Sequence, residues 1–247
     1  MRTVSAPRRG AYGLDAPAQL YWMGAVVVAL LVVALAVYPA LGLGIPWYLL
    51  VLAALFAVQF GLYLHATRWG KFVVWDRLLD EMGLRGDERL LDMGCGRGAV
   101  LLAAARRLPN GRAVGVDLWR TVDQSGNAQD VTERNAEAEG VADRVELHTA
   151  DMTELPFGAG EFDVVVSSLA IHNIPSAALR RAAVREALRV VRPGGRLVLV
   201  DIFKTSEYQR ALEEFGALEV EDRSVGWRMW WGGPWVASRI VTATRSL

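Results

Sequence analysis

Residues 90–98 constrain this 247-residue chain more than any other segment, because an apolar strand there runs into a glycine-rich turn. The sequence Leu-Leu-Asp-Met-Gly-Cys-Gly-Arg-Gly places three glycines at alternate positions, and residues 99–108 then have a helical pattern. Glycine permits a tight strand-to-helix turn and lets the backbone approach a ligand that a Cβ atom would exclude. Asp92, two residues ahead of the first glycine, puts a carboxylate beside that ligand. The segment therefore predicts a binding site for a cationic or ammonium-bearing group.

A second segment is set apart by its lack of charge. From Ala16 to Thr67 the chain contains no Asp, Glu, Lys or Arg, which is too long for one membrane-spanning helix of about 20 residues but suits two. We predict helices over 20–41 and 47–64, with Gly42, Gly44 and Pro46 in the turn. Aromatic residues mark both expected membrane surfaces, namely Tyr21, Trp22, Tyr38, Trp47 and Tyr48. A buried hairpin of a water-soluble protein is the alternative, against which the missing periodic polar positions count.

Basic residues flank this uncharged run on both sides, whereas its central turn carries no charge. The flanking residues are Arg2, Arg8, Arg9, Arg68 and Lys71. By the positive-inside rule, both ends of the uncharged run lie in the cytoplasm. The excess of arginine over lysine in the chain is typical of a GC-rich bacterial genome. We therefore predict an integral protein of the bacterial inner membrane, with a basic cytoplasmic N-terminus over 1–19, a two-helix transmembrane hairpin over 20–66 and a cytoplasmic catalytic domain over 67–247.

The distribution of charge and cysteine excludes several classes of function. Residues 1–70 carry a net charge of +3 and the remainder −3, so the larger part lacks the basic face of a nucleic-acid-binding protein. Cys95 is the only cysteine, which excludes an internal disulfide and a Cys-cluster zinc site. We predict no metal site, no nucleic-acid partner, and a filler role for Cys95 in the glycine turn.

Residues 71–247 alternate between expected helices and strands. The strands span 89–93, 113–116, 145–149, 162–167 and 196–200, and the helices span 71–83, 99–108, 130–140, 177–191 and 206–215. Asp130 or Thr132 is the expected N-cap of the third helix. Such alternation predicts a mostly parallel sheet with helices on both faces. Residues 217–225 and 235–244 break it and predict an antiparallel hairpin at the sheet edge, joined through Gly232-Gly233-Pro234.

The glycine pattern by itself leaves a nicotinamide-dependent oxidoreductase open. Gly94, Gly96 and Ala99 satisfy the dinucleotide-binding pattern G-x-G-x-x-G/A, which is also followed by an acid about 20 residues later. Two features count against that class. Asp92 would lie close to a pyrophosphate of like charge, and no second mononucleotide-binding half follows the fifth strand.

Taken together, the motifs resemble those of class I S-adenosylmethionine-dependent methyltransferases. The likeness rests on residues 92–98, Asp117, Asp151 and the Pro193-Gly194-Gly195 turn, covers roughly residues 71–247, and indicates the small-molecule group that includes quinone C-methyltransferases. It implies a Rossmann-like, doubly wound α/β fold with a mostly parallel seven-stranded sheet. It also implies that S-adenosylmethionine binds at the carboxyl ends of the strands.

The resemblance further implies which residues contact the cofactor. Asp117 would accept both ribose hydroxyls, Asp151 the adenine amino group with Met152 against the ring, and Leu118 and Trp119 would add an apolar wall. The full implied set is Asp92, Gly94, Cys95, Gly96, Gly98, Asp117, Leu118, Asp151, Met152 and Ser168. Helix capping or solvation is the alternative for the loop aspartates.

His172 is the candidate catalytic residue, because it follows the fourth strand, where this family faces methyl donor and acceptor. Positioning contributes much of the rate of an in-line methyl transfer, and a base is needed only if the acceptor must lose a proton. A histidine pKa lies near working pH, which suits that task. A hydrogen-bonded loop histidine is the alternative, and we expect His65 and His148 to be structural.

The acceptor is left open by the sequence, although the membrane segment favours a hydrophobic small molecule, a quinone or a lipid. Trp227, Trp230, Trp231 and Trp235 would wall an acceptor pocket, hold a quaternary ammonium, contact lipid headgroups or pack at the sheet edge. Residues 119–129 either cover the cofactor or form a plain surface loop. A membrane-protein or peptide acceptor, and a cofactor-binding scaffold without turnover, are the remaining alternatives. The oligomeric state is left open.

Overall fold

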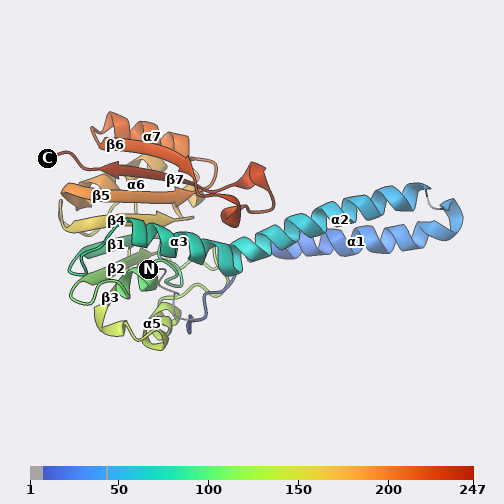
Figure 1. Cartoon of the computed structure of the whole chain (residues 1–247), viewed down its shortest axis with the longest axis horizontal. Helices are drawn as coiled ribbons and strands as arrows, with labels where there is room; N and C mark the ends of the chain where they lie inside the picture. Colours follow the sequence, from blue (N-terminus) through green and yellow to red (C-terminus); the bar gives the residue numbers. More distant parts are fainter. Residues whose placement is uncertain (1–7, 43) are drawn as a thin grey trace.

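Seven strands form one sheet in the order β3-β2-β1-β4-β5-β7-β6 in the computed structural model, which describes residues 8–42 and 44–247 (Figure 1). The strands are β1 (Arg89–Met93), β2 (Arg112–Asp117), β3 (Val145–Thr149), β4 (Phe162–Ser168), β5 (Val191–Asp201), β6 (Leu218–Ser224) and β7 (Arg239–Thr244). Strands β1 to β5 pair in parallel, and β7 pairs antiparallel with both β5 and β6. The predicted α/β fold and the antiparallel hairpin at the sheet edge are confirmed.

Helices cover both faces of the sheet. They are α3 (Lys71–Glu81), α4 (Leu101–Ala105), α5 (Gln129–Ala138), α6 (Ala177–Val190) and α7 (Thr205–Glu214). Successive side chains of a strand point to opposite faces, so Leu90 belongs to the core under α3 and α4, and Leu91 to the core under α6 and α7. Because β1, β2 and β4 run parallel, their carboxyl ends lie at the same edge of the sheet.

The predicted starts of two strands are wrong. Strand β5 begins at Val191, so the Pro193–Gly195 turn lies within it. Trp235 lies in a 3-10 helix, η5 (Pro234–Val236), and β7 begins only at Arg239. Gly232 adopts a φ of 106°, and the proline that follows cannot donate to a strand ladder, so this stretch stays outside the sheet.

The predicted N-cap of α5 is also wrong. Its N-cap is Ala128, which makes no side-chain capping bond, and Thr132 lies one turn inside the helix. The Thr132 hydroxyl instead donates to the carbonyl of Gly96 at 2.8 Å. This contact ties α5 to the glycine turn.

Two long apolar helices, α1 (Pro17–Leu41) and α2 (Gly44–His65), form a hairpin that projects from the α/β body (Figure 1). Gly44 and Pro46 lie in the first turn of α2 and not in the connecting turn as predicted; a proline is tolerated there because first-turn N–H groups have no helical partner. By length and composition, α1 and the helical stretch that begins with α2 are long and apolar enough to cross a membrane, and few of their apolar residues are buried. Side chains such as Leu35, 74% exposed, lack the burial expected of a soluble core hairpin.

The second helix of the hairpin continues into the α/β body without a break. A π-helical segment, η1 (Ala66–Gly70), joins α2 directly to α3, so the two predicted helices are one continuous helical rod. The wider turn of a π-helix rotates the side chains that follow. The apolar hairpin and the first helix of the α/β body are therefore joined by continuous helical backbone.

Candidate cofactor and acceptor site

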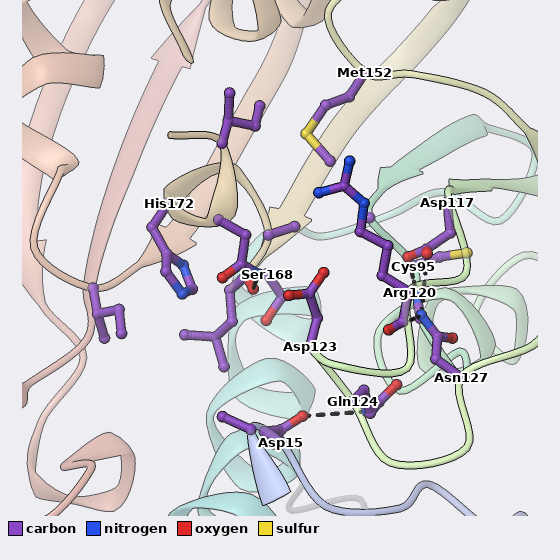
Figure 2. A pocket seen from close by; sticks show the side chains of 18 of the residues that line it. Asp15, Cys95, Asp117, Arg120, Asp123, Gln124, Asn127, Met152, Ser168 and His172 are labelled. Carbon is purple, nitrogen blue, oxygen red and sulfur yellow. Dashed lines mark hydrogen bonds between the residues drawn. The ribbon is translucent and has the colours of Figure 1, made fainter. Parts of the chain in front are cut away.

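A cavity of about 720 Å³ lies at the carboxyl ends of the strands, where the glycine turn, the loop after β2 and the loop after β4 meet (Figure 2). Nearly all of the residues predicted from the sequence line it: Asp92, Gly94, Cys95, Gly96, Asp117, Leu118, Asp151, Met152, Ser168 and His172. Its volume lies in the upper part of the range of about 300–1,000 Å³ that is typical of sites for drug-sized ligands. The cavity has room for a second molecule beside a nucleoside cofactor.

The glycine turn has the backbone shape that only glycine adopts without strain. Gly94 has a φ of 75°, and a Cβ atom on it would lie 2.3 Å from the Cβ of Ala170. Gly96 has a φ of 50°, and its Cβ would lie 2.6 Å from Oε1 of Gln124. These two positions confirm the close backbone approach expected of the turn.

Gly98 has a packing role and is not among the residues that line the cavity. A Cβ atom on Gly98 would meet Leu102 at 2.9 Å and Thr132 at 3.1 Å. Gly98 thus allows α4 to pack closely against the turn and α5. Its contact with the cofactor stays a prediction.

Asp92 is a buried carboxylate that lines the cavity. It is 1% exposed, and neither of its oxygens has a hydrogen-bond partner within normal geometry in the described part of the chain. Burial, together with the negative charge of Asp117, raises the pKa of Asp92 to about 7, against a lowering effect of the backbone N–H of Leu101. An orphaned carboxylate at the floor of a cavity fits a ligand that brings its own positive charge.

Cys95 lies in the same buried setting. Burial, and the charges of Asp92 and Asp117, raise the pKa of the Cys95 thiol. A thiol with a raised pKa is a poor nucleophile. The filler role predicted for Cys95 fits this environment.

Asp117 ends β2 and is already engaged by the protein. It accepts from the backbone N–H of Gly96 at 2.8 Å, from that of Trp119 at 2.6 Å and from Nδ2 of Asn127 at 3.1 Å. A carboxylate offers about four acceptor positions, so one remains for a ribose hydroxyl. Asp117 therefore shapes the glycine turn as well as facing the cavity.

The expected adenine side of the cavity differs in part from the prediction. Leu118 lines it, but Trp119 is not among the lining residues; its Nε1 donates to Oγ1 of Thr149 at 2.8 Å. Asp151 is exposed and accepts from the N–H and the hydroxyl of Thr153, both at 2.8 Å. Met152 also lines the cavity.

His172 belongs to a hydrogen-bonded pair that the sequence did not reveal. It lies in a 3-10 turn, η3 (Ile171–Asn173), and its Nδ1 is 2.5 Å from Oδ1 of Asp201, which is 2% exposed at the end of β5. Asp201 also accepts from the hydroxyl of Tyr208 at 3.1 Å and from the backbone N–H of Ile202 at 2.8 Å. Burial lowers the pKa of His172, but the hydrogen bond and charge of Asp201 outweigh it, so the pKa is raised. Figure 2 shows His172 across the cavity from Asp117.

Residues of the helical hairpin and of the N-terminal strap (residues 8–16) also line the cavity. Asp15, Gln19 on α1, Tyr63 on α2, and Lys71 and Trp75 on α3 are among them. Sequence reasoning treated this region as a membrane anchor, and Lys71 only as a flanking charge. The one available signal was the i, i+4 spacing of Lys71 and Trp75, which puts both on one helix face.

Of the four tryptophans near the final hairpin, only Trp231 lines the cavity. Its ring contacts Tyr63 edge to face at 5.3 Å, and its Nε1 donates to Ser238 at 2.9 Å. Trp227 instead stacks on His65 at 4.9 Å, and Trp235 is 66% exposed. The four side chains therefore do not form one acceptor wall.

Comparison with known proteins supports the same chemistry. Residues 91–199 match the family described as a methyltransferase domain. The chain is similar to 27-O-demethylrifamycin SV methyltransferase of Amycolatopsis mediterranei, with 38% identity over 128 residues, 51% of this chain and 43% of that protein. It is similar to the ubiquinone/menaquinone biosynthesis C-methyltransferase UbiE of Dinoroseobacter shibae, with 34% identity over 52% of this chain and 48% of that protein. The chain thus matches less than half the length of these relatives.

Solved structures share the fold at low sequence identity. The [4+2]-cyclase SpnF has a TM-score of 0.57 and 21% identity, over 70% of this chain and 82% of that chain. Geranyl diphosphate C-methyltransferase from Streptomyces coelicolor A3(2), solved with S-adenosyl-L-homocysteine, has a TM-score of 0.56 and 19% identity, over 69% of this chain and 78% of that chain. Residues 91–199 are thus similar to the methyltransferase domains of these proteins, and the match supports S-adenosylmethionine as the cofactor.

Proposed function

We propose that this chain is a membrane-anchored methyltransferase that moves the methyl group of S-adenosylmethionine to a hydrophobic small molecule, a quinone or a lipid. One observation carries the proposal. A single cavity is lined by the glycine turn, by His172, and by Gln19 and Tyr63 at the base of the two apolar helices. The cofactor site, the proton acceptor His172 and the ends of the apolar helices nearest the α/β body therefore share one cavity.

The length of the hairpin supports delivery of the acceptor from the bilayer. Helix α1 has 25 residues, whereas about 20 suffice to cross the hydrocarbon core. With the Gly42 turn at the far surface, the first residues of α1, including Gln19, lie at the near surface. An acceptor dissolved in the membrane reaches the cavity there without entering water.

The proposed division of the chain follows from this placement: an N-terminal segment over 1–19, a transmembrane hairpin over 20–66 and a catalytic domain over 67–247. Arg2 lies outside the described residues. Arg8 pairs with Asp76 at 2.5 Å and Lys71 with Asp15 at 2.6 Å, so these two flanking charges are neutralised by partners. The positive charges of Arg9 and Arg68 still support a placement of both ends of the hairpin in the cytoplasm of a bacterial cell.

The residues around the cavity favour a methyl acceptor that gives up a proton. When bound, S-adenosylmethionine supplies a methyl group on a positively charged sulfur, and transfer breaks the methyl–sulfur bond to leave a neutral thioether. His172 Nδ1 is engaged by Asp201, so Nε2 is the nitrogen that accepts the acceptor's proton. Asp201 then stabilises the imidazolium. This arrangement favours an acceptor that loses a proton, such as a hydroxyl group or the ring carbon of a hydroquinone.

A labelling experiment tests the proposal. Membranes from cells lacking the gene are incubated with purified protein and S-adenosylmethionine labelled in the methyl group. We expect label in the organic extract, on a species heavier by one CH2 group in mass spectrometry, and none with the His172→Ala protein. Label confined to the protein pellet would instead support a protein or peptide acceptor. Binding of the cofactor without any transfer would support a scaffold.

A further inference from the structure

The side chains that line the cavity include more acids than cations, and this excess of negative charge affects how the cofactor binds. Five aspartates line it, against the two cations Lys71 and Arg120. The aspartates are Asp15, Asp92, Asp117, Asp123 and Asp151. S-adenosylmethionine carries a sulfonium, an ammonium and a carboxylate, so its net charge is positive. The acidic cavity suits the cofactor as a whole, but its carboxylate requires a cation.

Lys71 has the position that this carboxylate requires. It is 4% exposed, and it lies one helical turn before Trp75. Trp75 Nε1 donates at 2.8 Å to Oγ of Ser168, the last residue of β4. Residues four apart share a helix face, so Lys71 and Trp75 both face the cavity. Arg120 is less suited because it is exposed and lies three residues beyond Asp117, on the ribose side.

A short hydrogen-bond chain joins Lys71 to the glycine turn. Lys71 Nζ donates to Oδ2 of Asp15 at 2.6 Å, and Gln124 Nε2 donates to Oδ1 of the same carboxylate at 3.2 Å. Gln124 Oε1 in turn accepts from the backbone N–H of Arg97 at 2.9 Å. The ammonium group of Lys71 is thereby tied to the glycine turn, and it lines the same cavity as Asp92. An ammonium has three donors, so two remain for a ligand.

We propose that Lys71 binds the carboxylate of the cofactor's methionyl end while Asp92 binds its ammonium, so that the membrane-linked helix supplies half of the amino-acid subsite. This inference rests on the proposed function. Asp15 is the positioning residue, because it holds Lys71 in the cavity through contacts that also reach Thr67 at 2.8 Å. The cofactor site is then incomplete without the helix that continues from the hairpin.

Calorimetry with two ligands on the full chain in detergent tests this assignment. The ligands are S-adenosylhomocysteine and its decarboxylated analogue, which keeps the amine and lacks the carboxylate. Lys71→Met should weaken S-adenosylhomocysteine about tenfold to a hundredfold, as expected for a lost charge-assisted hydrogen bond, and leave the analogue's affinity unchanged. Asp92→Asn should weaken both ligands, and Lys71→Arg should retain part of the preference for the carboxylate.

The matched control is Lys204→Met. Lys204 is the chain's other lysine, is half exposed beside Glu207 and does not line the cavity, so both ligands should bind as to the natural protein. Equal weakening of both ligands by Lys71→Met, total loss included, would overturn the assignment of Lys71. Failure of the natural protein to bind S-adenosylhomocysteine would instead overturn the proposed function itself.

Discussion

A buried carboxylate without a partner is unfavourable, and Asp92 is such a group. Its pKa is raised to about 7, so between pH of about 4 and 7 the folded protein binds a proton that the unfolded chain has released. The free energy of unfolding therefore falls as pH rises through this window. Asn mimics the protonated form and removes the dependence.

We predict that the melting temperature of the cofactor-free protein, relative to Asp92→Asn, falls as pH rises from about 4 to 7. Ionisation of Asp92 is what an ammonium ligand requires, so S-adenosylhomocysteine should bind the natural protein more tightly toward the upper end of the window. Thermal melts and calorimetry at matched pH check both trends. A constant difference in melting temperature would show that Asp92 does not titrate in this range.

The pair of His172 and Asp201 predicts a second outcome. His172→Ala should lower turnover by about 10²–10⁴-fold and leave cofactor affinity nearly unchanged, because the base acts on the acceptor. The raised pKa of His172 means that turnover rises with pH up to a value above the ordinary histidine range. Asp201→Asn removes the charge that raises this pKa, so its inflection should move to lower pH. An unmoved inflection would assign the pH profile to another group.

Among the elements, the strand-to-helix turn after β1 has little room for an added side-chain atom. Gly94→Ala introduces a methyl group 2.3 Å from the Cβ of Ala170 and forces a φ of 75° on an alanine. The left-handed conformation alone costs about 1–2 kcal/mol.

We predict that Gly94→Ala lowers the melting temperature and abolishes detectable S-adenosylhomocysteine binding. The double variant Gly94→Ala/Ala170→Gly removes the clash and keeps the strained φ. It should recover part of the stability and binding in the same two assays. If the double variant were no better than the single one, the contact with Ala170 would not be the cause.

At the level of the whole molecule, the continuous rod of α2, η1 and α3 joins the hairpin to the catalytic body. The N-terminal strap adds a second connection, with the hydroxyl of Tyr12 donating at 2.8 Å to Glu139, the C-cap residue of α5. Gly70 in η1 packs closely against the backbone of Arg228, and a Cβ atom on Gly70 would lie 1.8 Å from the carbonyl oxygen of Arg228. The hairpin is therefore packed against the body and is not a loose tether.

We predict that the protein sediments with membranes and resists extraction by carbonate. Val28→Arg places a charge near the middle of α1, which costs about 2.5–3.5 kcal/mol in a membrane-spanning helix and little on a water-exposed one. This variant should become extractable, whereas Leu247→Arg at the exposed C-terminus should behave as the natural protein. Release of the natural protein by carbonate would mean that the hairpin only lies against the membrane.

Local pattern was sufficient for most of the fold and for part of the site. Strands β1 and β3 lie at their predicted residues, because alternating or continuous apolar runs between turn residues are local signals. The glycine turn and Asp92 were recognisable for the same reason, since their spacing is dictated by one strand and one turn. The packing of Gly98 against α4 and α5, and the hydrogen bond of Trp119 to Thr149, were not recognisable because they depend on residues distant in the chain.

The sequence by itself determined a parallel α/β sheet, the glycine turn with its acid, and a long uncharged segment. Only the tertiary structure brought Asp201 to His172 across 29 residues, and Asp15 and Lys71 into the cavity that Asp92 lines. The physical reason is that a hydrogen bond between distant residues leaves no periodic trace in the chain. It exists only once the sheet and the helical rod have set the two backbones side by side.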